Sequence, residues 1–202
     1  MPNLLLFDYT GTFAFAAFGA YLAERKGYDI FGVIAIAFVS ALGGGTLREV
    51  LFNNLPVYFY EYGYWLAVLS GAAFAVVFYK KFPQLHRFML AIDAVGLVTF
   101  AFIGAGRAAE VGLGFFAIVT CAVLTAVGGG ILRDVLMRET PIIFYHDFYA
   151  TPAFVVAVGY FFFEPYMSAS RVVYPFLSGI FILRLLSIRF GFRLWKPNKL
   201  QM

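Results

Sequence analysis

The feature that most constrains this chain is a series of seven long apolar segments separated by short polar connections. A helix that crosses a bilayer needs about 20 mostly apolar residues. The segments are Leu4–Leu22, Phe31–Leu51, Tyr64–Tyr79, Phe88–Gly106, Phe115–Met137, Phe148–Phe163 and Val172–Ile188. With 62% hydrophobic and 13% charged residues among 202, the chain has too few polar side chains to cover a soluble fold of this size. We therefore predict an all-α integral membrane protein with seven transmembrane helices.

The distribution of lysine and arginine predicts the orientation. If the N-terminus lies outside, the inside segments carry ten basic residues and the outside segments carry two. The inside residues are Arg25, Lys26, Lys80, Lys81, Arg87, Arg138, Arg189, Arg193, Lys196 and Lys199, and the outside residues are Arg107 and Arg171. Because cytoplasmic loops are enriched in Lys and Arg, we predict an N-out, C-in topology. The net charge of +4 is interpreted as this orientation signal and not as nucleic-acid binding.

An internal repeat runs through the first six segments at a fixed offset of 85 residues. Between Leu5 and Tyr64, 23 of 60 positions are identical to the residue 85 places later. The matched pairs include Asp8/Asp93, Gly11/Gly96, Phe15/Phe100, Gly19/Gly104, Phe31/Phe116, Pro56/Pro141, Phe59/Phe144 and Tyr60/Tyr145. Each copy holds an odd number of spans, so the second must be inverted relative to the first. We predict one membrane domain over 1–202, with repeats at 4–82 and 89–163 and a seventh helix at 172–190.

The most strongly repeated block carries three consecutive glycines in each copy. They are Gly43, Gly44 and Gly45 in the first repeat and Gly128, Gly129 and Gly130 in the second. Glycine lowers helix stability by about 1 kcal/mol relative to alanine, so a triplet favours a kink or local unwinding that exposes carbonyls to a permeating cation. The alternative is close helix packing through small residues, which is common in membranes. Because the triplets occupy matching places in an inverted repeat, we favour the first interpretation.

Charged side chains near the triplets are the second candidate feature. They are Asp8, Arg48 and Glu49 in the first repeat and Asp93, Arg133 and Asp134 in the second. A charge inside the bilayer costs at least about 2.5–3.5 kcal/mol, so these groups need partners or water. They are interpreted as a charged pore lining or gate, or else as structural ion pairs or interfacial anchors. Adjacent helix residues do not face each other, so we expect each arginine to contact an aspartate of the first or fourth span.

The remaining polar residues do not indicate catalysis. A lone cysteine, Cys121, excludes a disulfide framework and any paired-cysteine metal or redox motif. His86 and His146 have no metal-ligand spacing, and the aromatic residues around Tyr64 and Trp65 are typical of an interfacial belt. No catalytic triad or phosphate-binding loop is recognisable. We expect neither an enzyme nor a bound cofactor or metal.

The doubled block, at residues 43–51 and 128–136, has the pattern Gly-Gly-Gly-x-Leu-Arg-[Asp/Glu]-Val-Leu. In a seven-span chain with a three-plus-three inverted repeat, it resembles the prokaryotic trimeric intracellular cation (TRIC) channels, also called glycine-transporter-domain or UPF-type membrane proteins. The resemblance implies a homotrimer embedded in the lipid of a prokaryotic inner membrane. It also implies one monovalent-cation pore per protomer, between second and fifth helices kinked at their glycines, with potassium as the expected permeant ion and sodium as a second candidate.

Two other functions fit the same sequence features. Inverted repeats with broken helices also build secondary transporters, so a carrier for a small amino acid such as glycine is the main alternative. A membrane-embedded structural or regulatory subunit is a third interpretation, although it leaves the doubled polar motif without a use. Unitary potassium currents would favour the channel, whereas saturable glycine counterflow without them would favour the transporter.

Overall fold

The computed structural model describes residues 4–79, 85–144, 148–167 and 169–192, and within these ranges the regular secondary structure is entirely helical. The helices are α1 (Leu4–Arg25), α2 (Ile30–Leu51), α3 (Gly63–Tyr79), α4 (Leu85–Glu110), α5 (Phe115–Leu136), α6 (Thr151–Phe163) and α7 (Ser170–Phe190), with short turns η1 (Val57–Phe59), η2 (Ile142–Phe144) and η3 (Glu164–Tyr166). Each predicted segment corresponds to one of these α-helices, which confirms the predicted all-α membrane fold. Within the described residues, four helices are long and apolar enough to cross a membrane: α2, most of α4, α5 and α7.

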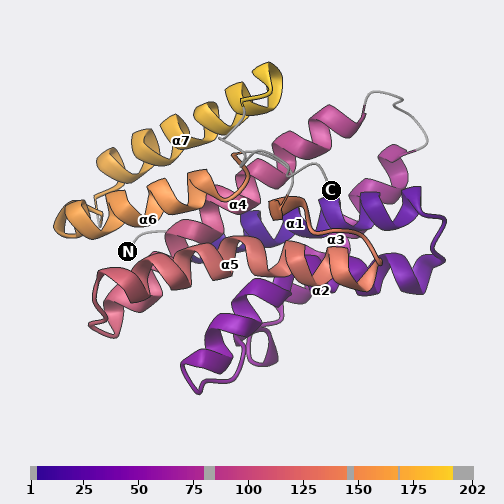
Figure 1. The fold of residues 1–202 in the computed structure, drawn as a ribbon. Coiled ribbons are helices and arrows are strands. Elements are labelled where there is room, and N and C mark those ends of the chain that lie inside the picture. The colour runs from indigo at the N-terminus through magenta and orange to yellow at the C-terminus, as the bar shows by residue number, and fades with distance from the viewer. Residues whose placement is uncertain (1–3, 80–84, 145–147, 168, 193–202) are drawn as a thin grey trace, which may run out of the picture.

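Helices α1 and α4 form the centre of the bundle. Both present alanines with no exposed surface, such as Ala16 and Ala20 in α1 and Ala101 and Ala105 in α4. Small side chains allow neighbouring helices to approach closely without a hydrophobic driving force. Helix α1 packs against α2 and α3, and α4 packs against α5 and α6, so each central helix gathers its own repeat. Helix α7 lies outside both repeats, beside α4 and α6 (Figure 1).

The two repeats meet through contacts that are exchanged between equivalent positions. The rings of Phe15 in α1 and Phe100 in α4 pack edge to face, with their centroids 5.2 Å apart. Each ring also lies where the other helix has a glycine, Phe100 against Gly11 and Phe15 against Gly96. These two glycines, like the two rings, are 85 positions apart. The exchange is what a pseudo-two-fold axis between α1 and α4 requires, and it confirms the predicted inverted repeat.

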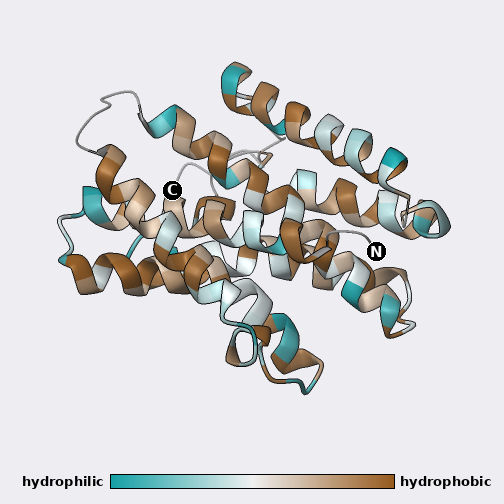
Figure 2. Ribbon diagram, turned by 180° about the vertical axis from the view of Figure 1, so that it is seen from behind, coloured by the Kyte–Doolittle hydropathy of each residue, from teal (hydrophilic) through white to brown (hydrophobic). Residues whose placement is uncertain are grey.

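The outer surface of the bundle suits a lipid environment. Phe31 at the start of α2 is 78% exposed, and its equivalent Phe116 at the start of α5 is 83% exposed. Hydrophobic residues run along the helices, while hydrophilic ones gather toward helix ends and connections (Figure 2). Some of the basic residues behind the predicted orientation lie outside the described residues, namely Lys80, Lys81, Arg193, Lys196 and Lys199. The N-out, C-in topology therefore stays a prediction.

Candidate functional site

The glycine triplets bring α2 and α5 into backbone contact. A Cβ built on Gly44 would clash with the carbonyl of Thr125, and one built on Gly129 would clash with the carbonyl of Ser40. Gly43 faces the same interface, because its Cβ would lie 3.2 Å from the Cα of Gly129. Only glycine permits helices to approach this closely.

Both helices remain α-helical through the triplets, so the expected local unwinding is not present, while the predicted kink and pore role of these glycines stay predictions. α2 runs unbroken from Ile30 to Leu51, and α5 from Phe115 to Leu136. The physical reason is that the backbone groups stay hydrogen-bonded within each helix, while tight packing against the partner helix offsets the low helix propensity of glycine. The packing interpretation is therefore the one that the structure supports for Gly43, Gly44, Gly128 and Gly129. Gly45 and Gly130 differ, since a Cβ on either would meet neighbouring atoms no closer than 3.4 Å.

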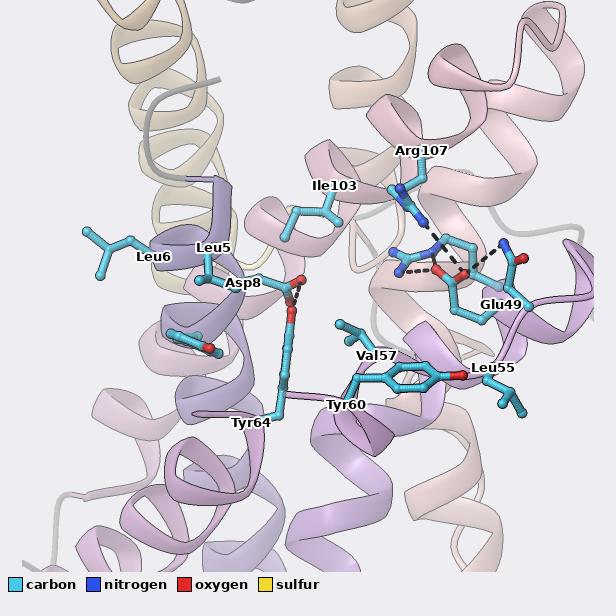
Figure 3. Close-up of a pocket in the computed structure, with 13 residues that line it drawn as sticks. Leu5, Leu6, Asp8, Glu49, Leu55, Val57, Tyr60, Tyr64, Ile103 and Arg107 are labelled. Atoms are coloured by element: carbon cyan, nitrogen blue, oxygen red, sulfur yellow. Dashed lines mark hydrogen bonds and ion pairs between the residues drawn. The ribbon is translucent and has the colours of Figure 1, made fainter. Parts of the chain in front are cut away.

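In the first repeat, the predicted charged residues gather at one end of the bundle. The Tyr64 hydroxyl donates a hydrogen bond of 2.6 Å to Asp8 Oδ2. Arg48 donates to Glu49 Oε1 from Nε at 2.9 Å and from Nη2 at 2.7 Å. Arg107 at the end of α4 approaches the other Glu49 oxygen, with Nη2 at 3.8 Å. Figure 3 shows the Asp8 carboxylate pointing at Tyr64 and the Glu49 carboxylate pointing toward Arg107.

The second repeat reproduces this arrangement 85 residues later. The Tyr149 hydroxyl donates a long hydrogen bond of 3.4 Å to Asp93 Oδ1. Arg133 Nε donates to Asp134 Oδ1 at 2.8 Å, and the backbone N–H of Ile142 donates to Asp134 Oδ2 at 2.9 Å. Two aspartate–tyrosine pairs and two arginine–acid pairs are therefore related by the same symmetry as the helices.

The expected pairing of the arginines was wrong. Each arginine contacts the acid next to it in sequence, and each aspartate of the first or fourth span contacts a tyrosine. Adjacent residues on a helix do point in different directions, but an arginine side chain has four rotatable bonds and can fold around the helix surface to its neighbour. The guanidinium of Arg133 also lies over the ring of Phe18, 4.9 Å from its centroid, which holds it in this curled position.

A large cavity opens at the first cluster. Its volume is about 990 Å³, and its lining includes Asp8, Arg48, Glu49, Tyr64 and Arg107. Asp8, Arg48, Glu49 and Tyr64 also line a narrow space of about 20 Å³, where they meet Thr12, Gly45 and Thr125. That volume holds about one water molecule. We call the large cavity the vestibule and the small space the constriction.

The second cluster is sealed where the first is open. Asp93 is 1% exposed and Arg133 is 0% exposed, whereas Asp8 is partly exposed and lines the vestibule. Asp93 Oδ2 and Arg133 Nη2 are buried without a hydrogen-bond partner. Arg48 and Glu49 are 5% and 4% exposed, so the arginine–acid pairs are buried in both halves, and the halves differ in access to water at their aspartates.

Sequence reasoning missed several residues of the site. Tyr64 was interpreted as part of an interfacial belt, yet its side chain is buried and holds Asp8. The signal that could have identified it was the repeat itself, because Tyr64 and Tyr149 are an identical pair at the common offset. Arg107 and Arg184 also belong to the site, but neither is matched by an arginine 85 positions away. No sequence pattern therefore points to them.

Of the two histidines, the structure describes His86, which lies away from both clusters. His86 Nδ1 lies 3.4 Å from Arg25 Nη1 at the far end of α1, and His146 lies outside the described residues. Within the described ranges, no group of three His, Cys, Asp or Glu side chains is arranged to hold a metal ion.

Comparison with known proteins gives concordant results. A family model described as glycine transporter matches the chain twice, at residues 5–80 and 90–165. The UPF0126 membrane protein of Deinococcus radiodurans is 39% identical over 150 residues, covering 72% of this chain and 69% of its own length. The UPF0126 inner membrane protein YadS of Escherichia coli K12 is 37% identical, covering 73% of this chain and 72% of its own length. The crystal structure of the TRIC trimeric intracellular cation channel orthologue from Rhodobacter sphaeroides superposes with a TM-score of 0.86 at 32% identity, covering 95% of this chain and 100% of that one.

Proposed function

The chain belongs to the TRIC channel family, and from this premise we propose that it is a cation channel of a bacterial inner membrane, with one permeation pathway in each protomer. The proposal uses the vestibule as the wide mouth of that pathway and the constriction as its narrow part. Both lie within a single chain, between helices of the same bundle. A pore of this kind does not need a second copy to complete it.

The observation that carries the proposal is the way in which the vestibule narrows. Where it meets the constriction, small and hydroxyl-bearing residues of α1, α2 and α5 join the charged side chains of Asp8, Arg48 and Glu49 in the lining. Thr12 Oγ1 lines the constriction and has no hydrogen-bond partner. A buried hydroxyl without a partner is costly unless water or an ion satisfies it. A partly dehydrated cation in the constriction would do so.

The charges of the vestibule fit a pore for monovalent cations with weak discrimination among them. The carboxylates of Asp8 and Glu49 are matched by the guanidinium groups of Arg48 and Arg107, so no acidic ring encircles the path. Sharp selectivity requires several oxygens that replace the hydration shell together. We expect potassium to permeate and sodium to follow it, and reversal potentials in mixed potassium and sodium solutions measure this. Strong preference for potassium would contradict it.

The test of the channel is a recording of purified protein in planar bilayers. We expect unitary potassium currents from the wild-type protein and their loss in Thr12→Leu, because the larger apolar side chain fills the constriction. The matched control is Thr10→Leu, on the exposed side of the same helix, which should conduct normally. Normal currents in Thr12→Leu would place the pathway elsewhere.

The alternative function is a secondary transporter for a small amino acid such as glycine. One observation favours it: the two equivalent clusters are open in one half and sealed in the other, as alternating access requires. Saturable glycine counterflow in proteoliposomes, without unitary currents, would establish the transporter.

We further propose that the chain assembles as a homotrimer, because the similar Rhodobacter sphaeroides protein is described as a trimeric channel orthologue. The mass of the detergent-solubilised protein, measured by light scattering with the detergent contribution subtracted, tests this directly. A monomer with channel activity would reject the trimer and leave the pathway within one protomer.

A further inference from the structure

The sealed cluster contains an arginine that has no counterpart in the open one. Arg184 comes from α7, the helix outside the repeat, and is 5% exposed. Its guanidinium lies over the ring of Tyr149, with Cζ 5.1 Å from the centroid. In the first repeat the equivalent tyrosine, Tyr64, packs instead against the edge of Tyr9, with centroids 5.0 Å apart. The two halves therefore differ in their added arginines: Arg107 of α4 joins the first cluster at Glu49, and Arg184 of α7 joins the second at Tyr149.

Arg184 is held at this place by polar contacts on two elements. Its Nη1 donates a 3.1 Å hydrogen bond to the carbonyl of Phe148 and lies 3.4 Å from Ser187 Oγ. Hydrogen bonds from a charged donor are stronger than neutral ones. By contacting the residue before Tyr149 and the ring of Tyr149 itself, Arg184 fixes the segment that places the Tyr149 hydroxyl beside Asp93.

The backbone at this contact is strained. Phe148 has φ 65°, a left-handed conformation that bulky residues rarely adopt. The equivalent position in the first repeat is Gly63, which begins α3 and does not have a positive φ, so the left-handed turn belongs to the second repeat. A strained residue persists only where its surroundings hold it, and such residues gather at switch regions. The hydrogen bond from Arg184 to the Phe148 carbonyl is one such constraint.

We propose that Arg184 is a positioning residue that keeps the second half of the pathway sealed, and that its release from Phe148 and Tyr149 opens a second vestibule around Asp93 and Arg133. Asp93 Oδ2 and Arg133 Nη2 are buried there without hydrogen-bond partners, and water entering the cluster would hydrogen-bond to both. Opening would give both clusters the same access to water that only the first has in this structure. The proposal deepens the proposed channel function by assigning its regulation to α7.

The test measures access of water-soluble reagents to the sealed cluster. Gly130 suits a reporter, since a Cβ there would lie 3.4 Å from the Tyr149 hydroxyl and 3.6 Å from Arg133 Nη2. The reporter is Gly130→Cys in a Cys121→Ser background, because Cys121 is the chain's lone cysteine. The rate of modification by a small methanethiosulfonate is compared with and without Arg184→Gln. We expect an increase of about tenfold or more, as for the loss of one hydrogen bond to a charged group.

Two further variants separate sealing from general damage. Arg189→Gln makes the same change on an exposed site of the same helix and should leave the rate unchanged. Arg184→Lys keeps the buried charge, but one ammonium cannot both bind the Phe148 carbonyl and stack on Tyr149, so an intermediate rate is expected. It also carries the test if Arg184→Gln does not fold.

An unchanged rate in the folded Arg184 variants, or an equal increase in Arg189→Gln, would overturn the proposal. Currents distinguish this result from a failure of the channel itself. If the rate rises but no variant conducts potassium, the sealing role stands and the channel is rejected. If the protein conducts and the rate does not change, the channel stands and Arg184 is only structural.

Discussion

At the scale of single residues, the length and flexibility of the arginine side chain determine which acid it pairs with. The direction in which its Cα–Cβ bond leaves the helix does not. Arg48 and Arg133 each form an ion pair with the adjacent acid. The aspartates of α1 and α4 instead accept hydrogen bonds from tyrosines. A buried pair loses more when one partner is removed than when both are. The coupling between neighbours is therefore measurable.

We predict strong coupling between Arg48 and Glu49 and weak coupling between Arg48 and Asp8. Arg48→Ala should destabilise the protein by about 3 kcal/mol, and adding Glu49→Gln should recover part of that loss. The measurement is a double-mutant cycle on the free energy of unfolding in detergent, with Arg48→Ala and Asp8→Asn as the control cycle. Additive effects in the first cycle would show that the pair seen at 2.7 Å contributes nothing.

At the scale of elements, α2 and α5 are joined through glycines that serve as a packing surface. The carbonyls of Thr125 and Ser40 occupy the space that side chains would need at Gly44 and Gly129. The third glycine of each triplet is free of this constraint. The two roles considered from sequence, flexibility and packing, therefore predict different effects along one triplet.

We predict that Gly44→Ala and Gly129→Ala each destabilise the protein by about 1–3 kcal/mol, because the added methyl group overpacks the α2–α5 interface. Gly45→Ala is the matched control and should be tolerated or stabilising, since its Cβ would meet only Arg48 Nη2 at 4.0 Å. Thermal unfolding of the purified variants measures both. Equal effects at Gly44 and Gly45 would restore the flexibility interpretation.

At the scale of the whole molecule, two halves with the same residues are in different states. The asymmetry arises outside the repeat, because α7 packs on α4 and α6, and the described residues hold no equivalent of α7 beside α1 and α3. It supplies Arg184 to one cluster alone. The pseudo-symmetry therefore describes the helices and not their access to water.

We predict that cysteines at the equivalent positions 45 and 130 react at different rates when Arg184 is intact. Gly45 lines the constriction beside the open vestibule, whereas Gly130 is buried in the sealed half. In a Cys121→Ser background, Gly45→Cys should be modified faster than Gly130→Cys by the same methanethiosulfonate. Equal rates would mean that the halves exchange quickly in solution and that the asymmetry of this structure is not maintained.

Much of the fold followed from the sequence alone. Segment length and polarity determine which stretches span a bilayer, because every backbone group there must be satisfied within its own helix. The inversion of the second repeat follows from three spans per copy. Both are properties of the chain read in order, and the structure confirms them. Four of the charged positions, Asp8, Asp93, Arg48 and Arg133, were also found from their repetition in apolar surroundings.

Only the tertiary structure decided how those residues are used. Tyr64 reaches Asp8 from 56 positions away, and Arg184 reaches the Phe148 carbonyl across 36 positions. The role of the glycines depended on how closely α5 approaches α2, and the difference between the halves depended on where α7 packs. Contacts of this kind are selected by the shape of the assembled bundle, where a few ångströms separate a sealed cluster from an open one. Local pattern and spacing carry no information on such distances, since the same helices could pack with either half exposed.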